Sequence, residues 1–355
     1  MKRSDLHHLV LCGCVVALLT GCGQRAPQSA GSTTGNTPPG NPSPPSEPTE
    51  PTQPTYSSGV SLSRPSVIVG TNGWGPTLVY HATDSESDSY ASLEGCLPAV
   101  DGQGNVYLLA FQYPWGCGYA LSSIDVYAPN SVGGSSTIRS LSVGPGTTIA
   151  NVTDMAVSPT GEIFVNDGKG VAVFGATANG SDAPVRYIQW DGGGETPLTP
   201  GYIAVDVKDN LYVQSGSSIA VFGPQDTGLV VPSRVINGPD TQLNAPGRMT
   251  TDAQGNLYVT TGSNSYVGIS VVEFASEANG DAVPLRSVSS TAMSNFSGFL
   301  GVAVDSSGLI YVRATDPFCG AIFVFPADAS GNSTPSSVLG GSCPAYDPDG
   351  TIAVF

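Results

Sequence analysis

Four aspartates recur at matching places along the chain, and a set of carboxylates of this kind can bind a divalent metal ion. Each follows a short apolar segment and precedes a turn; they are Asp101, Asp206, Asp252 and Asp305. Another copy of the same segment has Ser158 at this position. Serine is a poor metal ligand, but both residue types accept hydrogen bonds from backbone N–H groups in turns. We therefore expect these residues to form turns and not a metal site.

The cysteines are the second group of residues that could do chemistry. Four of them lie beyond the amino-terminal region: Cys96, Cys117, Cys319 and Cys343. They include no Cys-x2-Cys pair, and the only histidine beyond residue 21 is His81. Disulfides are therefore favoured over a zinc site. A Ser-His-Asp triad would also need His81, which the repeat described below places in an outer strand.

The first 21 residues have the pattern of a secretory signal peptide. Lys2 and Arg3 supply a short positive region, and an apolar stretch of 11 residues follows at Leu9–Leu19. A helix needs about 20 apolar residues to span a bilayer, so this stretch is too short. The sequence predicts a signal peptide at residues 1–21.

The end of this stretch, Leu19-Thr20-Gly21-Cys22, resembles the lipobox of bacterial lipoproteins. The resemblance implies cleavage before Cys22, lipid attachment at Cys22 and a lipid-anchored location in the bacterial cell envelope. Several acyl chains anchor a protein stably where one chain does not. Because residue 23 is Gly and not Asp, the resemblance implies the outer membrane. A plain secretory signal with a chance cysteine is the alternative.

Residues 22–58 begin with this cysteine and continue as a linker. Nine prolines lie between Pro27 and Pro54, among Ser, Thr, Gly and Asn. Hydrophobic residues are almost absent, so no core can offset the entropy of ordering. We expect a disordered spacer that could reach roughly 100 Å in polyproline conformation.

The charge of the chain excludes one class of partner. The formal net charge is −16; without residues 1–21 it is 10 basic minus 27 acidic residues, or −17. Phosphate backbones would repel a protein this acidic. We expect no nucleic-acid partner, and the only membrane contact expected is through the lipid.

A repeat of about 50 residues organises the rest of the chain. Each copy has a short apolar strand, a turn and an aromatic-rich strand, followed by a third and fourth strand. The aromatic positions are spaced by 57, 48, 46 and 53 residues; they are Tyr107, Phe164, Tyr212, Tyr258 and Tyr311. Four short strands per repeat are typical of β-propeller blades. The sequence predicts an all-β propeller over residues 59–355.

The segments Ile-Ala-Val-Asp, Asn-Leu-Tyr-Val and Val-x-Val-Phe resemble NHL-repeat propellers and, more broadly, six-bladed lactonase-like propellers. The resemblance covers most of residues 94–355. It implies the fold and leaves function open, since propellers include both binding proteins and enzymes.

The ends of the globular region predict six blades. Residues 352–355 match the first strand of a blade, while residues 67–69 and 78–80 match second and third strands. One blade would then combine a carboxy-terminal inner strand with amino-terminal outer strands, which closes the ring and hides the sheet edges. The length agrees, because 297 residues in six blades give 49.5 residues per blade.

The blade alignment places six residues around one mouth of the central channel: Leu97, Asp154, Tyr202, Arg248, Gly301 and Thr351. Asp154, Tyr202 and Arg248 come from consecutive blades and are candidates for holding a small polar ligand; a structural ion pair is the alternative. Lactonase-like metal sites resemble a cluster of Glu, Asp and Asn, and this ring has one carboxylate. We expect no catalytic residues and no cofactor, with a structural Ca²⁺ ion left open.

The same alignment suggests which cysteines pair. The cysteines lie in two classes of loop that emerge on one face of a propeller, and export to an oxidising compartment favours disulfides. Cys96 with Cys117 and Cys319 with Cys343 are the preferred pairs among three connectivities.

Five aromatic residues are expected in loops on this face: Tyr113, Trp115, Trp190, Tyr266 and Phe318. Exposed aromatics suit protein or glycan contacts, although several could pack beneath their loops. Four arginines recur in the outermost strands, where charge would protect a sheet edge; they are Arg139, Arg186, Arg234 and Arg286.

These observations favour a monomeric, non-enzymatic binding module that engages a protein or polysaccharide. A metal-dependent lactonase-like hydrolase or lyase acting at the channel mouth is the alternative. A structural protein without a specific ligand is the third hypothesis.

Overall fold

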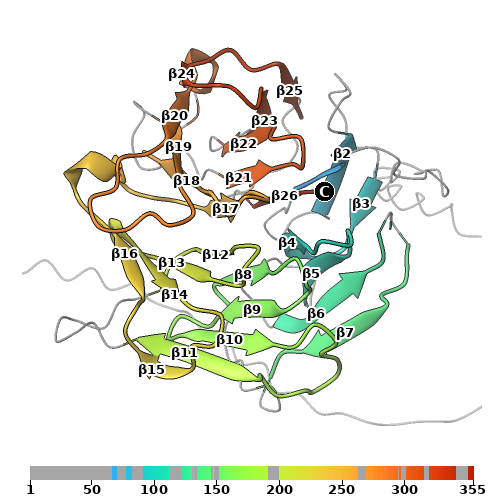
Figure 1. Cartoon of the computed structure of the whole chain (residues 1–355). Coiled ribbons are helices and arrows are strands. Elements are labelled where there is room, and N and C mark those ends of the chain that lie inside the picture. The colour runs from blue at the N-terminus through green and yellow to red at the C-terminus, as the bar shows by residue number, and fades with distance from the viewer. Residues whose placement is uncertain are drawn as a thin grey trace, which may run out of the picture. The chain divides into compact units, whose positions relative to one another are not determined.

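The structure is a computed structural model, and it describes residues 66–69, 77–81, 91–111, 121–129, 131, 134–144, 147, 152–190, 200–262, 269–294, 296, 301–315, 320–340 and 351–355. The described residues form six β-sheets arranged in a ring, with only two short 3-10 helices, η1 (Pro239–Thr241) and η2 (Thr291–Met293). The predicted six-bladed β-propeller is confirmed (Figure 1).

Each of the first five blades is an antiparallel sheet whose strands follow one another along the chain from the axis outward. Blade 1 has β4 (Cys96–Val100), β5 (Val106–Phe111), β6 (Leu121–Tyr127) and β7 (Arg139–Ser142). Blade 2 has β8 (Asp154–Val157), β9 (Ile163–Asn166), β10 (Val171–Phe174) and β11 (Arg186–Trp190). Blade 3 has β12 (Ile203–Val205), β13 (Leu211–Ser215), β14 (Ser218–Phe222) and β16 (Arg234–Ile236). Blade 4 has β17 (Met249–Thr251), β18 (Leu257–Thr261), β19 (Ser270–Phe274) and β20 (Arg286–Ser289). Blade 5 has β21 (Gly301–Val304), β22 (Ile310–Thr315), β23 (Gly320–Phe325) and β25 (Ser337–Leu339).

The closing blade joins the two ends of the globular region. Its strand order is β26 (Ile352–Val354), β1 (Ser66–Val69), β2 (Thr77–His81) and β3 (Ala91–Leu93). Val67 pairs with Val354 and Val69 with Ile352, and the backbone N–H of Ser66 donates to the carbonyl of Phe355 (3.0 Å). The innermost strand is therefore carboxy-terminal and the outer three are amino-terminal, as the sequence predicted.

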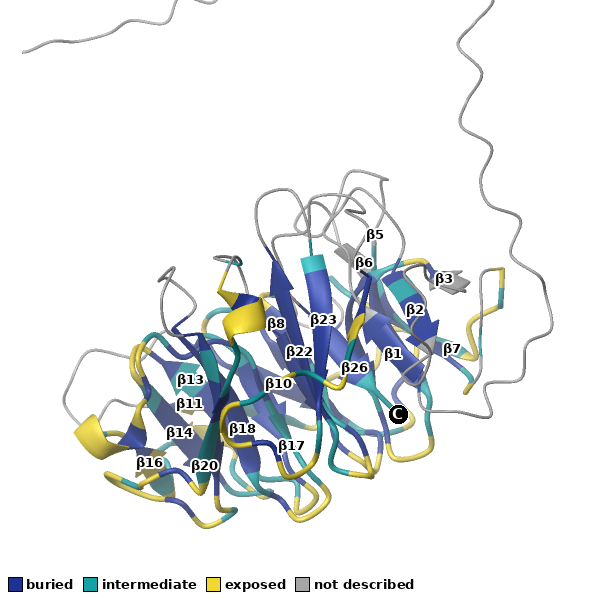
Figure 2. Ribbon diagram, turned by 90° about the horizontal axis from the view of Figure 1, so that it is seen from above, coloured by how far each residue is buried: buried dark blue, intermediate teal, exposed yellow. Residues whose placement is uncertain are grey.

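The hydrophobic core lies between the blades. Buried side chains form six clusters, and each cluster contains residues of two neighbouring blades. The aromatic residue of the second strand is fully buried in these clusters, as at Tyr107, Phe164 and Tyr311. Figure 2 shows that burial follows the strands while exposed residues gather in the connecting turns. Both faces of each sheet are covered, which explains the nearly continuous apolar sequence of the second and third strands.

The recurring aspartates lie in the turns between first and second strands. Asp101 Oδ1 accepts from the backbone N–H groups of Gln103 (2.9 Å) and Asn105 (3.0 Å), and its Oδ2 accepts from the Tyr107 hydroxyl (3.0 Å). Asp206, Asp252 and Asp305 make the same pattern of contacts. In blade 2, Ser158 Oγ accepts from the N–H of Glu162 (3.2 Å). These carboxylates hold turns, as predicted.

The prediction that the recurring arginines protect sheet edges by exposed charge was wrong. Arg234 Nη1 donates to the carbonyls of Ser276 (2.7 Å) and Ala278 (3.1 Å), which belong to the next blade. Arg139 Nη1 likewise donates to the carbonyl of Ala178 in blade 2 (3.2 Å). Arg186 and Arg286 also bind carbonyls of the next blade, and their side chains are only 13% and 19% exposed. These inter-blade arginines link consecutive blades.

The outer edges of several blades are covered by backbone. The loop before β16 contributes β15 (Gly228–Val230), which pairs in parallel with β11 of blade 2. The loop before β25 contributes β24 (Gly331–Asn332), which pairs with β20 of blade 4. Isolated β-bridges act in the same way at two other edges: Gly180 pairs with Leu141 of blade 1, and Gly280 pairs with Ile236 of blade 3. Each of these loops belongs to the following blade, so edge coverage and inter-blade linkage arise from one segment.

Candidate functional site

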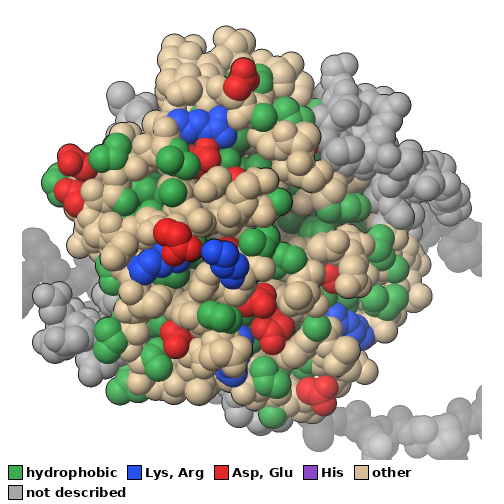
Figure 3. Space-filling model, viewed as in Figure 1, with side chains coloured by type: hydrophobic (Ala, Val, Ile, Leu, Met, Phe, Trp, Pro, Cys, Tyr) green, Lys and Arg blue, Asp and Glu red, His purple; other side chains and the backbone are tan. Residues whose placement is uncertain are grey.

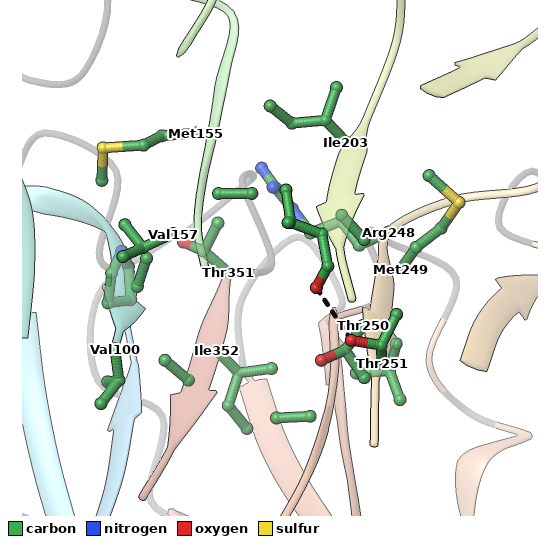
Figure 4. A pocket seen from close by; sticks show the side chains of 18 of the residues that line it. Val100, Met155, Val157, Ile203, Arg248, Met249, Thr250, Thr251, Thr351 and Ile352 are labelled. Atoms are coloured by element: carbon green, nitrogen blue, oxygen red, sulfur yellow. Dashed lines mark hydrogen bonds between the residues drawn. The ribbon is translucent and has the colours of Figure 1, made fainter. Parts of the chain in front are cut away.

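A cavity of about 150 Å³ lies on the axis of the ring, between the innermost strands. All six blades contribute to its wall through residues 98–100, 154–157, 203–205, 248–251, 302–304 and 351–354. Most of these side chains are Ala, Val, Ile or Met, but Asp154, Arg248 and three threonines also line the space, so its surface is partly apolar and partly polar. Figure 4 shows Arg248, Thr351 and Ile203 around this space.

The three channel-mouth candidates lie together at one end of the cavity. Arg248 Nη1 donates to Asp154 Oδ1 at 2.8 Å, and the guanidinium carbon lies 4.7 Å from the centre of the Tyr202 ring. The ion pair joins blade 2 to blade 4, which are not neighbours in the ring because blade 3 lies between them. The Asp154 and Arg248 side chains are 4% and 13% exposed, so the pair is shielded from solvent screening.

Both carboxylate oxygens of Asp154 have partners. Its Oδ2 accepts from the backbone N–H of Ile203 (2.8 Å), at the start of β12. An arginine and a backbone N–H therefore hold this carboxylate in place from two sides. Its chemistry is therefore that of a fixed counter-ion that holds Arg248 over Tyr202.

Thr351 lies at the same end of the cavity, directly before β26. Its carbonyl accepts from Arg313 Nη1 (3.0 Å), but its hydroxyl is buried without a hydrogen-bond partner. Arg313 is a functional candidate that sequence reasoning missed. The available signal was a charged residue inside the apolar strand β22, where burial requires a partner.

The two other predicted ring positions do not line the cavity. Leu97 is buried with a positive φ of 49°, at an irregularity in the pairing of β4 with β5. Gly301 begins β21 and pairs with Arg313. In the part of the chain that the structure describes, no group of three or more His, Cys, Asp and Glu residues could hold a metal ion.

The proposed aromatic binding surface needs one correction. Trp190 is only 6% exposed; it ends β11 and packs on Phe222 of blade 3, with ring centroids 5.2 Å apart. It was predicted to lie in a surface loop, but its ring is buried and contacts the neighbouring blade. The other four candidates, Tyr113, Trp115, Tyr266 and Phe318, lie outside the described residues.

The cysteine pairs stay predictions. Cys96 begins β4, is 1% exposed and is not without a bonding partner. Its three candidate partners, Cys117, Cys319 and Cys343, also lie outside them, as does Cys22.

Buried tyrosines extend the turn network toward the inter-blade arginines. Tyr212 donates its hydroxyl to Asp206 Oδ2 (3.2 Å), and Arg234 lies over its ring at 5.9 Å. Burial raises the pKa of Tyr212 to about 12, although the nearby Arg234 lowers it. The same groups recur at Tyr258, whose pKa burial also raises to about 12. These phenols are neutral hydrogen-bond donors at physiological pH.

Charges of both signs are interspersed on the face shown in Figure 3, which does not carry a broad basic patch. One exposed ion pair, Lys208 with Glu277 at 3.2 Å, joins turns of blades 3 and 4. No helix among the described segments is long and apolar enough to cross a membrane.

Comparison with solved structures identifies other propellers. A protein of unknown function from Bacteroides caccae is 12% identical, with a TM-score of 0.52 over 82% of this chain and 99% of that chain. A protein from Lactobacillus plantarum is 14% identical, with a TM-score of 0.45 over 77% and 82%. A streptogramin B lyase is 11% identical, with a TM-score of 0.43 over 77% and 74%. No protein-family model and no curated protein sequence matches the chain. At these identities the similarity concerns the fold alone.

Proposed function

We propose that this protein is a non-enzymatic binding module with NHL-like repeats, held at the bacterial cell envelope through a lipid on Cys22. The propeller would stand away from the outer membrane on the linker of residues 22–58. It would bind a protein or polysaccharide with the face that carries the channel mouth and the loops containing Tyr113, Trp115, Tyr266 and Phe318.

One observation carries the binding role. Asp154, the carboxylate at the channel mouth, has both oxygens occupied by Arg248 and the N–H of Ile203. The repeated aspartates are likewise occupied in turns, as at Asp101. The charged groups of the ring thus stabilise the scaffold, and the loops on the channel-mouth face vary in length and sequence from blade to blade. Loops on a rigid scaffold are the usual location of binding residues.

Disulfides within the pairs Cys96–Cys117 and Cys319–Cys343 would fix two of these loops. Cys96 is buried and pairs with Leu109, near the end of the strand after which the segment with Cys117 follows in sequence, which supports the first pair. Free-thiol labelling of the exported protein under denaturing conditions tests this proposal. We expect no reactive thiol before reduction, and full labelling at these four positions without reduction contradicts it.

The partner surface is tested by capture from envelope extracts with the wild-type protein and a Trp115→Ala/Tyr266→Ala variant. The matched control is Leu229→Ala/Val231→Ala, because these apolar side chains are 67% and 72% exposed on the outer rim of the ring. We expect partner recovery to fall only in the aromatic variant. Equal recovery by all three proteins rejects the aromatic surface.

The anchor is tested by incorporation of labelled palmitate in the bacterial host. Cys22→Ala should abolish labelling and release the protein from membranes. Cys14→Ala, in the signal region, is the matched control and should keep both properties. Labelling that survives Cys22→Ala rejects the lipid assignment.

A further inference from the structure

We infer that the axial cavity binds a small uncharged molecule that has a ring-sized apolar body and one hydroxyl or carbonyl group. The cavity lies inside the ring and is separate from the loop surface proposed above for a macromolecular partner. Its volume, its charge balance and one unsatisfied hydroxyl define this ligand class.

The volume sets the size of the ligand. At about 150 Å³, the cavity is smaller than the usual pockets for drug-sized ligands. A cavity of this volume with aliphatic walls can hold a molecule the size of benzene. The apolar part of the wall here comes from Val100, Val304 and Val354 together with alanines from five blades, and polar groups make up the rest of the wall.

The charge balance argues for an uncharged ligand. Among the described residues, the charged side chains that line the cavity are Asp154 and Arg248, and they neutralise each other at 2.8 Å. A ligand carboxylate would meet Asp154, and a ligand ammonium would meet Arg248. Either charge would lose its hydration without gaining an unshared partner of opposite sign.

Thr351 supplies the polar contact. Thr351 is 5% exposed and lines the cavity, and its Oγ1 has no hydrogen-bond partner. Rotation about χ1 exchanges the positions of the hydroxyl and the methyl group, so the hydroxyl can be presented to the cavity. A ligand oxygen would satisfy a group that the empty protein leaves unpaired.

Three probes of similar size test the inference: phenol, benzene and benzoate. Binding to the full mature protein is measured by calorimetry or by ligand-detected NMR. We expect phenol and benzene to bind saturably, with benzoate at least tenfold weaker. Thr351→Val keeps the side-chain shape and should weaken phenol binding by about three- to tenfold, the effect of one neutral hydrogen bond, while benzene binding stays unchanged.

A filling variant confirms the location. Val304→Phe places a ring in the cavity and should abolish the binding of phenol and benzene. Saturable binding that Val304→Phe leaves unchanged overturns the inference, because the probes then bind elsewhere. If neither phenol nor benzene binds, the inference is also overturned and the cavity holds water only. Tighter binding of benzoate than of phenol would make it an anion site, and an equal effect of Thr351→Val on phenol and benzene would remove the hydroxyl from recognition.

Discussion

Replacing Arg248 by Met should destabilise the ring far more than removing an exposed ion pair does. The substitution leaves Asp154 buried with one hydrogen bond, from the N–H of Ile203. Removing one partner of a buried ion pair costs about 3–5 kcal/mol. Because the Arg248 side chain is 13% exposed, we expect the lower end, about 3 kcal/mol. For a domain of this size, that lowers the melting temperature by about 6 °C.

The matched control is Lys208→Met. It removes another ion pair between different blades, with Lys208 and Glu277 side chains that are 61% and 70% exposed. An exposed pair of this kind contributes little, so we expect a change within about 0.5 kcal/mol. Calorimetric melting and guanidinium unfolding of both variants give the comparison. The difference in stability between the wild type and Arg248→Met should change little at high salt, because the Arg248 pair is buried.

A double-mutant cycle separates the pair from its surroundings. The double variant Asp154→Leu/Arg248→Met removes both charges. Its loss of stability should be about 2 kcal/mol smaller than the sum of the losses in the two single variants. If Arg248→Met costs no more than Lys208→Met, or if the two changes at 154 and 248 simply add, the pair does not connect blades 2 and 4 energetically. The description of Asp154 as a structural counter-ion would then be wrong.

Three further predictions follow from the turns and the cavity. Asp206→Ala removes the acceptor of four hydrogen bonds and should cost about 3 kcal/mol in urea unfolding, while Asp206→Asn should cost clearly less. The pKa of Tyr212 is raised in the folded state, so its contribution to stability is complete below pH 10 and is lost as the pH rises through about 12. Unfolding midpoints measured from about pH 9 to 12 should therefore fall less steeply in Tyr212→Phe than in the wild type. Thr351→Val removes an unpaired buried hydroxyl and should raise the stability of the ligand-free protein by about 1 kcal/mol, whereas a loss of stability would show that the hydroxyl has a partner.

The fold was predictable because each blade repeats the same local pattern. The period of about 50 residues, the turn aspartates and the strand-like sequence at both ends were sufficient for the six-blade count and for the pairing of Val67 with Val354. The proximity of Asp154, Tyr202 and Arg248 also followed from the alignment, since equivalent positions of neighbouring blades lie side by side around the axis. Predicting that residues at such positions lie close together requires no knowledge of individual side-chain contacts.

The contacts that sequence reasoning missed depend on residues far along the chain. The inter-blade arginines bind carbonyls that lie 39 to 44 residues further on, in a loop of the next blade. Nothing near Arg234 in sequence distinguishes that contact from an exposed edge position. Trp190 is similar, because the Phe222 ring that it contacts belongs to blade 3 and lies 32 residues further along the chain. Arg313 was overlooked since its partner, the carbonyl of Thr351, has no sequence signature.

The cavity and the closure of the ring are physically linked. All six innermost strands line the cavity, including β26, which joins the ring only in the folded state. A ligand in the cavity would therefore bind the closed ring and not the open chain, and at a concentration of 100 times its Kd it would stabilise closure by about 2.7 kcal/mol. The closing blade is also where additional stability matters, because Ser337 of blade 5 stands at the position that the inter-blade arginine has in blades 1 to 4. The four inter-blade arginines join four of the six junctions, so an axial ligand would add stability to a ring whose closing blade is not joined by this repeated contact among the described residues.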